Sequence, residues 1–408
     1  MQDFGRVECG DLAFSSKREW LVTNGMGGYA MGTVSGILTR RYHGLLIAAL
    51  QAPVGRTLLV TKLDERVAYG GGCYDLYADR RAGGRVAPRG FLHLERFFLE
   101  GTTPVWHYAL GDALLEKRVW MQQGANTTYV WYRLARASTP LHLSLRAIVN
   151  HRDHHAGTHG AQPFRAAPGS VQKVEHGLRV SLREEGMPAY VLSDHAEATA
   201  ELKRARGYFL AEEAYQGLDA IDENLVAGRF ACTLRPGESV TFVATTAPEA
   251  GLDGETAYAE RRSREERLLV QARPQLDIDE PALEHLVLAA DQFVVRRPLP
   301  RAAGGEMGEY GGSVIAGYPW FGDWGRDTMI SLPGLALATG RPDVAEKILR
   351  TFAHYVECVS QTVRPRSRPT SPGFPRGRWP RRRPSGTGPA RPFVSPSEPR
   401  CGLPGTWT

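Results

Sequence analysis

The first 250 residues alternate short apolar runs with turn residues, which is the pattern of β-strands joined by tight turns. Runs rich in Val, Leu, Tyr and Trp recur between Trp20 and Pro248, with turns such as Gly111-Asp112 between them. Regular strands with short connections favour antiparallel pairing, and many in series favour a sandwich of two sheets. The runs that predict strands are Phe91–Phe98, Val105–Leu110, Leu114–Met121, Thr127–Leu134, Leu141–Val149, Leu178–Leu182, Ala189–Leu192 and Val240–Thr245.

Helical periodicity replaces this alternation near Gly251. A charged helix is predicted over Thr256–Ala272, and a second begins at Pro281. Proline costs little in a first helical turn, and Asp279 is the predicted N-cap. The apolar stripe of the second helix comprises Leu283, Leu286, Val287, Ala290, Phe293 and Val294.

A glycine-rich loop, Ala302–Gly317, precedes two more predicted helices. One runs from about Asp327 to Ala338 and ends at Gly340, and the other starts at Pro342. The last helix reaches about Val359, with one face formed by Val344, Ile348, Phe352 and Tyr355. Successive helices with short connections form αα-hairpins. The predicted organisation is a β domain (1–250), a helical linker (251–280), the start of an all-α domain (281–359) and a tail (360–408).

The positive charge of the chain is concentrated in that tail. The 408 residues carry 50 basic and 44 acidic side chains, a net charge of +6. From Gln361 to Thr408 there are 10 Arg, 11 Pro and one acid, Glu398, whereas the preceding 360 residues carry 40 basic against 43 acidic side chains. A near-neutral body does not favour a nucleic-acid partner. We expect a disordered tail, because its composition cannot bury enough apolar surface to offset chain entropy.

Cysteine usage and the N-terminus indicate a compartment. The five cysteines are scattered, odd in number and never in a Cys-x-x-Cys pair, which favours a reducing environment. Met1–Gly10 lacks the pattern of a secretory signal, and no stretch approaches the ~20 apolar residues that span a bilayer. We therefore expect a cytoplasmic protein with no membrane partner.

The glycines of Gly25–Ala30 match the dinucleotide fingerprint G-x-G-x-x-A, but their surroundings do not. A dinucleotide site needs a helix directly after the glycines and an acidic residue about 20 positions on. Here Met31–Ile37 is rich in Gly and β-branched residues, and Leu45–Leu50 is apolar or small. We therefore predict turns of a β-sheet, where glycines accommodate positive φ.

Histidines form a second candidate site. His151, His154 and His155 lie close together, with His159 nearby, and such a cluster can ligate a metal ion. However, the run follows a predicted strand, where polar residues usually form an exposed loop, so we expect no metal. His43, within Thr39–Leu46, is equally consistent with a structural and a functional histidine.

Most of the candidate chemistry lies between Val314 and Thr328. Sugars present apolar C–H faces and a ring of hydroxyls, so a sugar site needs flat aromatic surfaces and planar groups that make bidentate hydrogen bonds. Trp320 and Trp324 offer the first, and Arg326 with Asp327 offers the second. The alternative is structural: Asp327 caps the following helix, Trp320 and Phe321 fill core, and Asp323 pairs with Arg326. We favour the sugar site.

This segment also carries a family resemblance. Gly317–Thr328, preceded by Ala290–Val295, closely resembles the amylo-α-1,6-glucosidase domain of bacterial and archaeal glycogen debranching enzymes. Trp20–Ala30, Thr39–Leu46 and Leu115–Met121 are similar to the N-terminal β domain of that family. The resemblance implies an antiparallel β-supersandwich followed by the first helices of an (α/α)6 toroid. It further implies hydrolysis of α-1,6 branch linkages in glycogen or a related α-glucan, with no metal or organic cofactor.

The catalytic residues are not evident. Inverting hydrolysis needs two carboxyls roughly 6.5–9.5 Å apart, whereas Asp323 and Asp327 at helical spacing would be ~6 Å apart on one side. The resemblance implies that Arg326 and Asp327 clamp a terminal glucose and that the acid and base lie beyond residue 360, with Asp327 as the fallback. The candidate substrate-binding residues are Tyr318, Trp320, Asp323, Trp324, Arg326 and Asp327.

After about residue 357 the chain departs from the family pattern. We expect residues from about Cys358 onward to be read in a shifted frame, the alternative being a natural end with a basic arm. The chain would then be inactive alone, and the helix faces near Leu286, Leu335 and Ile348 would lack partners. A non-catalytic glucan-binding module is the alternative function. A nucleic-acid binder acting through the tail is a third, disfavoured because the tail has few aromatic residues.

Overall fold

The computed structural model describes residues 3–158, 167, 169–276, 280–299 and 310–361, with only the backbone for 356–361. The chain falls into two compact units, Met1–His354 and Tyr355–Thr408. Of the second unit only the end of one helix is described. The predicted tail, His159 and the predicted N-cap Asp279 lie outside the described residues.

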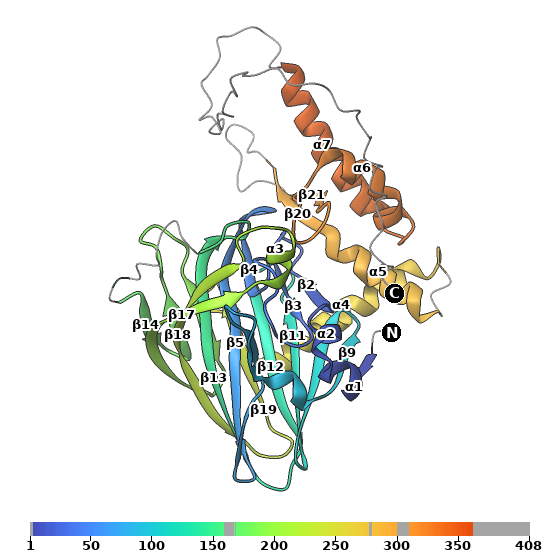
Figure 1. The fold of residues 1–408 in the computed structure, drawn as a ribbon. Coiled ribbons are helices and arrows are strands. Elements are labelled where there is room, and N and C mark those ends of the chain that lie inside the picture. Colours follow the sequence, from blue (N-terminus) through green and yellow to red (C-terminus); the bar gives the residue numbers. More distant parts are fainter. Residues whose placement is uncertain (1–2, 159–166, 168, 277–279, 300–309, 362–408) are drawn as a thin grey trace, which may run out of the picture. The chain divides into compact units, whose positions relative to one another are not determined.

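In this described part, two antiparallel sheets form most of the first unit (Figure 1). Both contain strands from distant parts of the sequence. One sheet has the spatial order β1 (Asp3–Gly5), β9 (Leu94–Glu100), β10 (Thr103–Leu110), β11 (Ala113–Met121), β12 (Thr127–Arg136), β19 (Ser239–Thr245), β16 (Ala189–Ser193), β15 (Gly177–Val180) and β14 (Val171–Val174). The other has the order β17 (Glu197–Phe209), β18 (Ile221–Leu234), β13 (Leu141–Asp153), β5 (Val54–Tyr69), β4 (Gly44–Gln51), β3 (Tyr29–Thr33) and β2 (Glu19–Thr23), with β6 (Gly72–Asp75) on β5.

Smaller elements border these sheets. Short helices are α1 (Arg6–Gly10), α2 (Leu12–Ser15) and α3 (Ala211–Tyr215), with a single 3₁₀ turn at Gly90–His93. Strands β7 (Ala78–Arg80) and β8 (Val86–Arg89) pair with each other. The predicted strand at Phe91–Phe98 therefore begins three residues later than expected, after the 3₁₀ turn.

The predicted sandwich is confirmed by the burial of alternate side chains between the sheets. Leu115 and Val119 of β11 lie in the main core with Val130 and Leu134 of β12. The opposite face of the same sheet is also covered, because Trp120 stacks on Tyr129 and contacts Tyr258 of helix α4 (Gly254–Ala272). Burial on both faces fits the apolar run Tyr129–Tyr132 of β12, whereas β11 carries Glu116, Lys117 and Arg118 in its middle.

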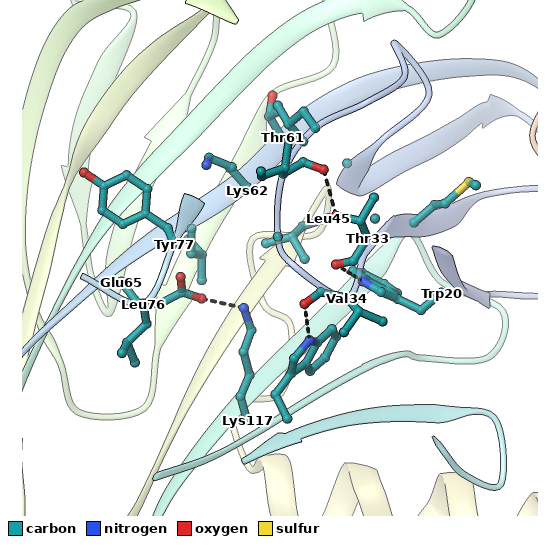
Figure 2. Close-up of a pocket in the computed structure, with 18 of the residues that line it drawn as sticks. Trp20, Thr33, Val34, Leu45, Thr61, Lys62, Glu65, Leu76, Tyr77 and Lys117 are labelled. Carbon is teal, nitrogen blue, oxygen red and sulfur yellow. Dashed lines mark hydrogen bonds and ion pairs between the residues drawn. The ribbon is translucent and has the colours of Figure 1, made fainter. Parts of the chain in front are cut away.

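The core also encloses a charged pair. The ammonium of Lys117 on β11 donates to the carboxylate of Glu65 on β5 (Figure 2). The same carboxylate accepts a hydrogen bond of 2.8 Å from the Tyr132 hydroxyl. Both charged side chains line an internal cavity of about 60 Å³. Trp20 and Trp106 line it too and donate their indole N–H groups to backbone carbonyls. The cavity lies inside the sandwich and apart from the aromatic segment near residue 320.

Helices follow the sandwich. They are α4 (Gly254–Ala272), α5 (Pro281–Phe293), α6 (Gly325–Leu332) with a π-helical turn at Pro333–Leu337, and α7 (Pro342–Gln361). Asp253 caps α4 by accepting from the Thr256 amide, while α5 begins at Pro281 as predicted with Glu280 in the N-cap position. The π-helical turn ends at Leu337 with Ala338 as its C-cap, and Gly340, at φ +71°, lies in the turn that leads to α7. None of the described helices is long and apolar enough to cross a membrane.

Two expectations about this region are wrong. The glycine-rich loop expected over Ala302–Gly317 contains strand β21 (Tyr310–Val314), which pairs with β20 (Val294–Pro298). Ile348 is fully buried and packs with Val314, Leu332, Ala336 and Ala345, so this face does not lack partners. Leu335 is partly buried in the same cluster, whereas Leu286 is 61% exposed, as expected for that position.

A buried carboxylate joins three of these elements. Asp291 on α5 receives a hydrogen bond of 2.6 Å from Arg264 on α4 and another of 2.6 Å from Arg341, which directly precedes α7. Burial alone would raise the pKa of Asp291, but its bonds to the two arginines outweigh burial and the net pKa is lowered. These ion pairs connect α4, α5 and the start of α7, in addition to the apolar packing between the helices. The described helices do not establish a toroid, which stays a prediction.

Candidate functional site

The aromatic loop, residues 317–324, connects β21 to α6 and contains most of the predicted sugar site. Its backbone closes on itself: the Phe321 amide donates to the Gly317 carbonyl at 2.8 Å, and the Ala316 amide donates to the Gly322 carbonyl at 2.9 Å. These hydrogen bonds make the loop a compact turn, which fixes where its side chains project.

Arg56 of strand β5 fastens this loop to the sandwich. Its guanidinium is almost fully buried and donates to the carbonyl oxygens of Gly27 at 2.8 Å, Pro319 at 3.2 Å and Phe321 at 2.9 Å. The guanidinium carbon also lies 4.8 Å from the ring centre of Tyr318. A guanidinium presents several N–H donors in one plane, which suits carbonyl oxygens that point toward the same place. The Arg56 side chain therefore holds the loop backbone at both Pro319 and Phe321.

Three aromatic side chains of the loop face solvent in part. Trp320 is 40% exposed, Phe321 is 44% exposed and Trp324 is 50% exposed. Phe321 and Trp324 pack edge to face with ring centres 5.3 Å apart. The structural alternative, in which Trp320 and Phe321 fill core, does not describe these positions. Phe321 was not among the predicted binding residues, although its place between two candidates could have indicated it.

Tyr318 lies elsewhere. It is buried against Tyr29, with ring centres 5.5 Å apart, and against Phe293 at 6.1 Å. The Tyr318–Pro319 peptide bond is cis. Tyr318 therefore anchors the loop in the apolar cluster beneath it and lies apart from the exposed aromatic surface.

Residues of the β domain surround Trp320. The guanidinium carbon of Arg40 lies 5.4 Å from the centre of the indole, and the Tyr42 ring lies edge-on at 6.3 Å. The Tyr42 hydroxyl is 3.1 Å from Nδ1 of His155, which is exposed. None of these three residues was predicted to belong to the sugar site, because no local pattern connects them to residue 320, and His155 was considered only as part of the histidine cluster. Arg40 and Tyr42 lie in the segment Thr39–Leu46, whose sequence does not indicate that it contacts the aromatic loop.

The carboxylates of Asp323, in the aromatic loop, and Asp327, in α6, have different surroundings. Asp323 is almost buried, forms an ion pair with Arg297 of β20 and accepts a hydrogen bond of 3.1 Å from Ser313 of β21. Asp327 lies in the first turn of α6, where the N-cap position belongs to Trp324. It is 3.7 Å from the mostly exposed guanidinium of Arg326. The alternative pairing of Asp323 with Arg326, and the capping role of Asp327, are therefore wrong.

The histidine run is not arranged as a metal site. Among the described residues, no group of three or more His, Cys, Asp and Glu side chains is placed to hold a metal ion. His154 is buried beside Tyr42, and neither of its ring nitrogens has a hydrogen-bond partner in the described chain. Burial, with the neighbouring charges of His155 and Arg56, lowers the pKa of His154 to about 4. It is therefore a neutral, packed imidazole at physiological pH.

His43 is a structural histidine. It is buried, its Nε2 lies 2.9 Å from a Glu19 carboxylate oxygen, and its Nδ1 accepts from the Thr39 amide at 3.2 Å. The same Glu19 oxygen accepts from Arg40 at 2.7 Å. Glu19 thereby holds Arg40 in place beside Trp320.

The glycines of the rejected dinucleotide motif form the predicted turn. They connect β2 to β3 in a hairpin, with Gly25 at φ +67° and Gly27 at φ +93°. A Cβ on Gly27 would lie 2.2 Å from the Pro53 carbonyl oxygen, so only glycine fits. The Gly25 carbonyl accepts from the Arg296 amide at 2.9 Å, which links this hairpin to β20.

Comparisons with solved structures include a match to a bacterial glucoamylase complexed with acarbose. It is 10% identical in sequence, the match covers 85% of this chain and 49% of that chain, and the TM-score is 0.38. The chain thus spans about half the length of that protein, and we base no argument on a likeness at this level. A comparison with curated proteins gave no match.

Comparisons with protein families are more informative. Residues 288–358 match the family described as amylo-alpha-1,6-glucosidase, a segment that includes the aromatic loop. Residues 18–241, which hold most of the sandwich, match the family described as glycogen debranching enzyme N terminal. Since this second match spans more than half of the sequence, the chain belongs to the glycogen debranching enzyme family.

Proposed function

We propose that this chain serves the hydrolysis of α-1,6-glucosidic branch linkages in glycogen or a related α-glucan, and that its own share of the site is glucan binding. The observation that carries the proposal is the exposed pair Trp320 and Trp324 on a loop whose backbone is fixed by Arg56. Flat aromatic faces held in place before binding lose little entropy when a sugar packs on them.

The polar half of the proposed site is Arg326 with Asp327. Both lie in the first turn of α6, directly after the aromatic loop, and Arg326 is mostly exposed. A guanidinium and a carboxylate side by side can donate to and accept from adjacent sugar hydroxyls. Asp323 differs, because its pairing with Arg297 and Ser313 occupies it within the protein. We assign it to the support of the loop.

Neither loop carboxylate is placed as a general acid. Asp323 is paired with Arg297 and Ser313 within the protein, and Asp327 lies 3.7 Å from Arg326, with which we assign it to sugar binding. The acid and base predicted beyond residue 360 fall outside the described residues. We therefore expect glucan binding by the 408-residue chain without measurable glucose release.

Affinity electrophoresis in gels containing glycogen tests this function. We expect retardation of the chain, loss of retardation in Trp320→Ala and Trp324→Ala, and little change in Leu202→Ala, a control at an exposed apolar position of β17. A branched limit dextrin incubated with the chain reports on glucose release. Retardation that survives both tryptophan substitutions would contradict the assignment of the site, and glucose release would contradict the expected lack of hydrolysis.

A further inference from the structure

A polar groove lies beside the aromatic loop and belongs entirely to the β domain. It has a volume of about 500 Å³ and is bordered by α2, α3 and the segment that leads to Arg40. Its lining includes Lys17, Glu19, Arg40, Glu212 and Tyr215. A volume of this size falls within the range of small-ligand sites.

Arg40 is shared between the groove and the aromatic loop. Its guanidinium lies over Trp320 on one side, with 5.4 Å between the guanidinium carbon and the ring centre. It also lines the groove, where it bonds Glu19 at 2.7 Å and approaches Glu212 at 3.6 Å. The two surfaces are therefore adjacent, and one extended ligand can contact both.

The charge of the groove favours a neutral ligand. Lys17 and Arg40 are balanced by Glu19 and Glu212, so the lining has no net charge to attract an anion or a cation. These groups offer both donors and acceptors, which suits a ligand with many hydroxyls. Lys17 is exposed and has no ion-pair partner among the described residues, so its ammonium is free to donate.

Tyr215 supplies an aromatic surface at the rim. It is the last residue of α3 and is 89% exposed, an unusual position for a tyrosine that neither packs in a core nor, in the described chain, hydrogen-bonds through its hydroxyl. An exposed ring beside a polar groove resembles the arrangement at the aromatic loop, where rings and polar groups also stand together.

We propose that this groove is a second α-glucan subsite, which binds glucose units of the same chain whose end lies at Trp320. The proposal rests on the function proposed above, because it takes its ligand class from the neighbouring site. Two subsites on one polymer raise the affinity for long chains over short ones, since the second contact is intramolecular.

Calorimetry with maltose and maltoheptaose on the full chain tests the proposal. Tyr215→Ala should weaken maltoheptaose binding about five- to tenfold and leave maltose binding unchanged. Tyr215→Phe keeps the ring and should bind like the wild type. Leu218→Ala removes a 49% exposed side chain three residues away and serves as the matched control.

The outcomes separate this proposal from the one on which it rests. Loss of both ligands in Trp320→Ala, with loss of only the long ligand in Tyr215→Ala, supports both proposals. Equal maltoheptaose affinity in Tyr215→Ala and wild type overturns the second subsite alone. Failure of the wild type to bind either ligand overturns the proposed function and the subsite together.

Discussion

Arg56 and Phe321, 265 positions apart in the chain, are joined by a hydrogen bond of 2.9 Å from the guanidinium to the carbonyl oxygen. The same guanidinium binds the Pro319 carbonyl, so a strand of the β domain determines the conformation of the aromatic loop. The sandwich therefore helps to build the candidate sugar site as well as supporting the helices.

Replacing Arg56 should lower the free energy of unfolding and also change the conformation of the aromatic loop. Arg56→Ala leaves three carbonyl oxygens without this donor, two of them buried, and we expect the free energy of unfolding to fall by about 2–4 kcal/mol. Urea unfolding measures the stability, and the tryptophan emission maximum should shift to the red. Arg133→Ala, at an exposed position of β12, is the control and should change neither. An unshifted emission in Arg56→Ala would contradict the anchoring role.

The charged pair inside the sandwich predicts an asymmetry between single and double variants. Lys117→Met leaves the Glu65 carboxylate buried without its cation, which should cost about 3–5 kcal/mol. Adding Glu65→Gln removes the uncompensated charge while an oxygen remains to accept from Tyr132, so part of the stability should return. Urea unfolding of both proteins makes the comparison. A double variant less stable than Lys117→Met would argue against a role of charge.

The different surroundings of Asp323 and Arg326 predict different phenotypes. Asp323→Asn weakens a nearly buried ion pair and should lower the free energy of unfolding by about 1–3 kcal/mol. Arg326→Ala removes a mostly exposed side chain and should change stability by less than about 0.5 kcal/mol while weakening glucan binding. Thermal unfolding and glycogen retardation should be measured on both. An Arg326→Ala protein that binds glycogen like the wild type would remove this residue from the site.

His154 predicts a loss of stability in mild acid. Burial lowers its pKa to about 4 in the folded chain, against 6.5 for an ordinary histidine, so the unfolded chain takes up the proton at higher pH. Stability from this group is present above pH 6.5 and falls as the pH drops towards 4. His93, His107, His151 and His285 add to the trend, because burial lowers their pKa values too.

His154→Phe separates the contribution of this histidine. The variant cannot titrate at this position, so its free energy of unfolding should depend less on pH between 4 and 6.5 than that of the wild type. His142→Phe, at an exposed position of β13, is the control. Parallel curves for wild type and His154→Phe would show that His154 is not held neutral by the fold.

Strands of the sandwich could be predicted wherever burial follows the apolar pattern. Leu115 and Val119 indicate strand β11 in the sequence because both are hydrophobic side chains of the core. Strand β5 is harder to recognise, since Lys62, Asp64 and Glu65 are buried in the middle of it. Lys62 and Asp64 pair with each other within the strand, but the remaining partners, Asp79, Lys117 and Arg146, lie on other strands and are not visible in a local pattern.

In the candidate site, too, some residues could be predicted from a local pattern and others depend on contacts between distant segments. Trp320, Trp324 and Arg326 could be identified because their chemistry is concentrated in one segment. The hairpin of β20 and β21 was missed because Gly311 and Gly312 suggested a loop, although a Cβ on Gly311 would contact Thr351 of α7 at 2.1 Å. The roles of Arg40 and Tyr42 come from contacts between distant segments and require the structure.

The bonds between Arg56 and the aromatic loop can form only late in synthesis. A ribosome releases strand β5 some 260 residues before the loop that Arg56 holds, and by then every strand of the sandwich has left the tunnel exit ahead of the loop. Two of the three carbonyl acceptors of Arg56, those of Pro319 and Phe321, arrive late, so until then only the Gly27 carbonyl can bind its guanidinium. The nascent sandwich thus keeps part of a buried guanidinium unpaired until the loop emerges, and the bonds of Arg56 join the Gly25–Arg296 hydrogen bond in coupling the two halves of the chain.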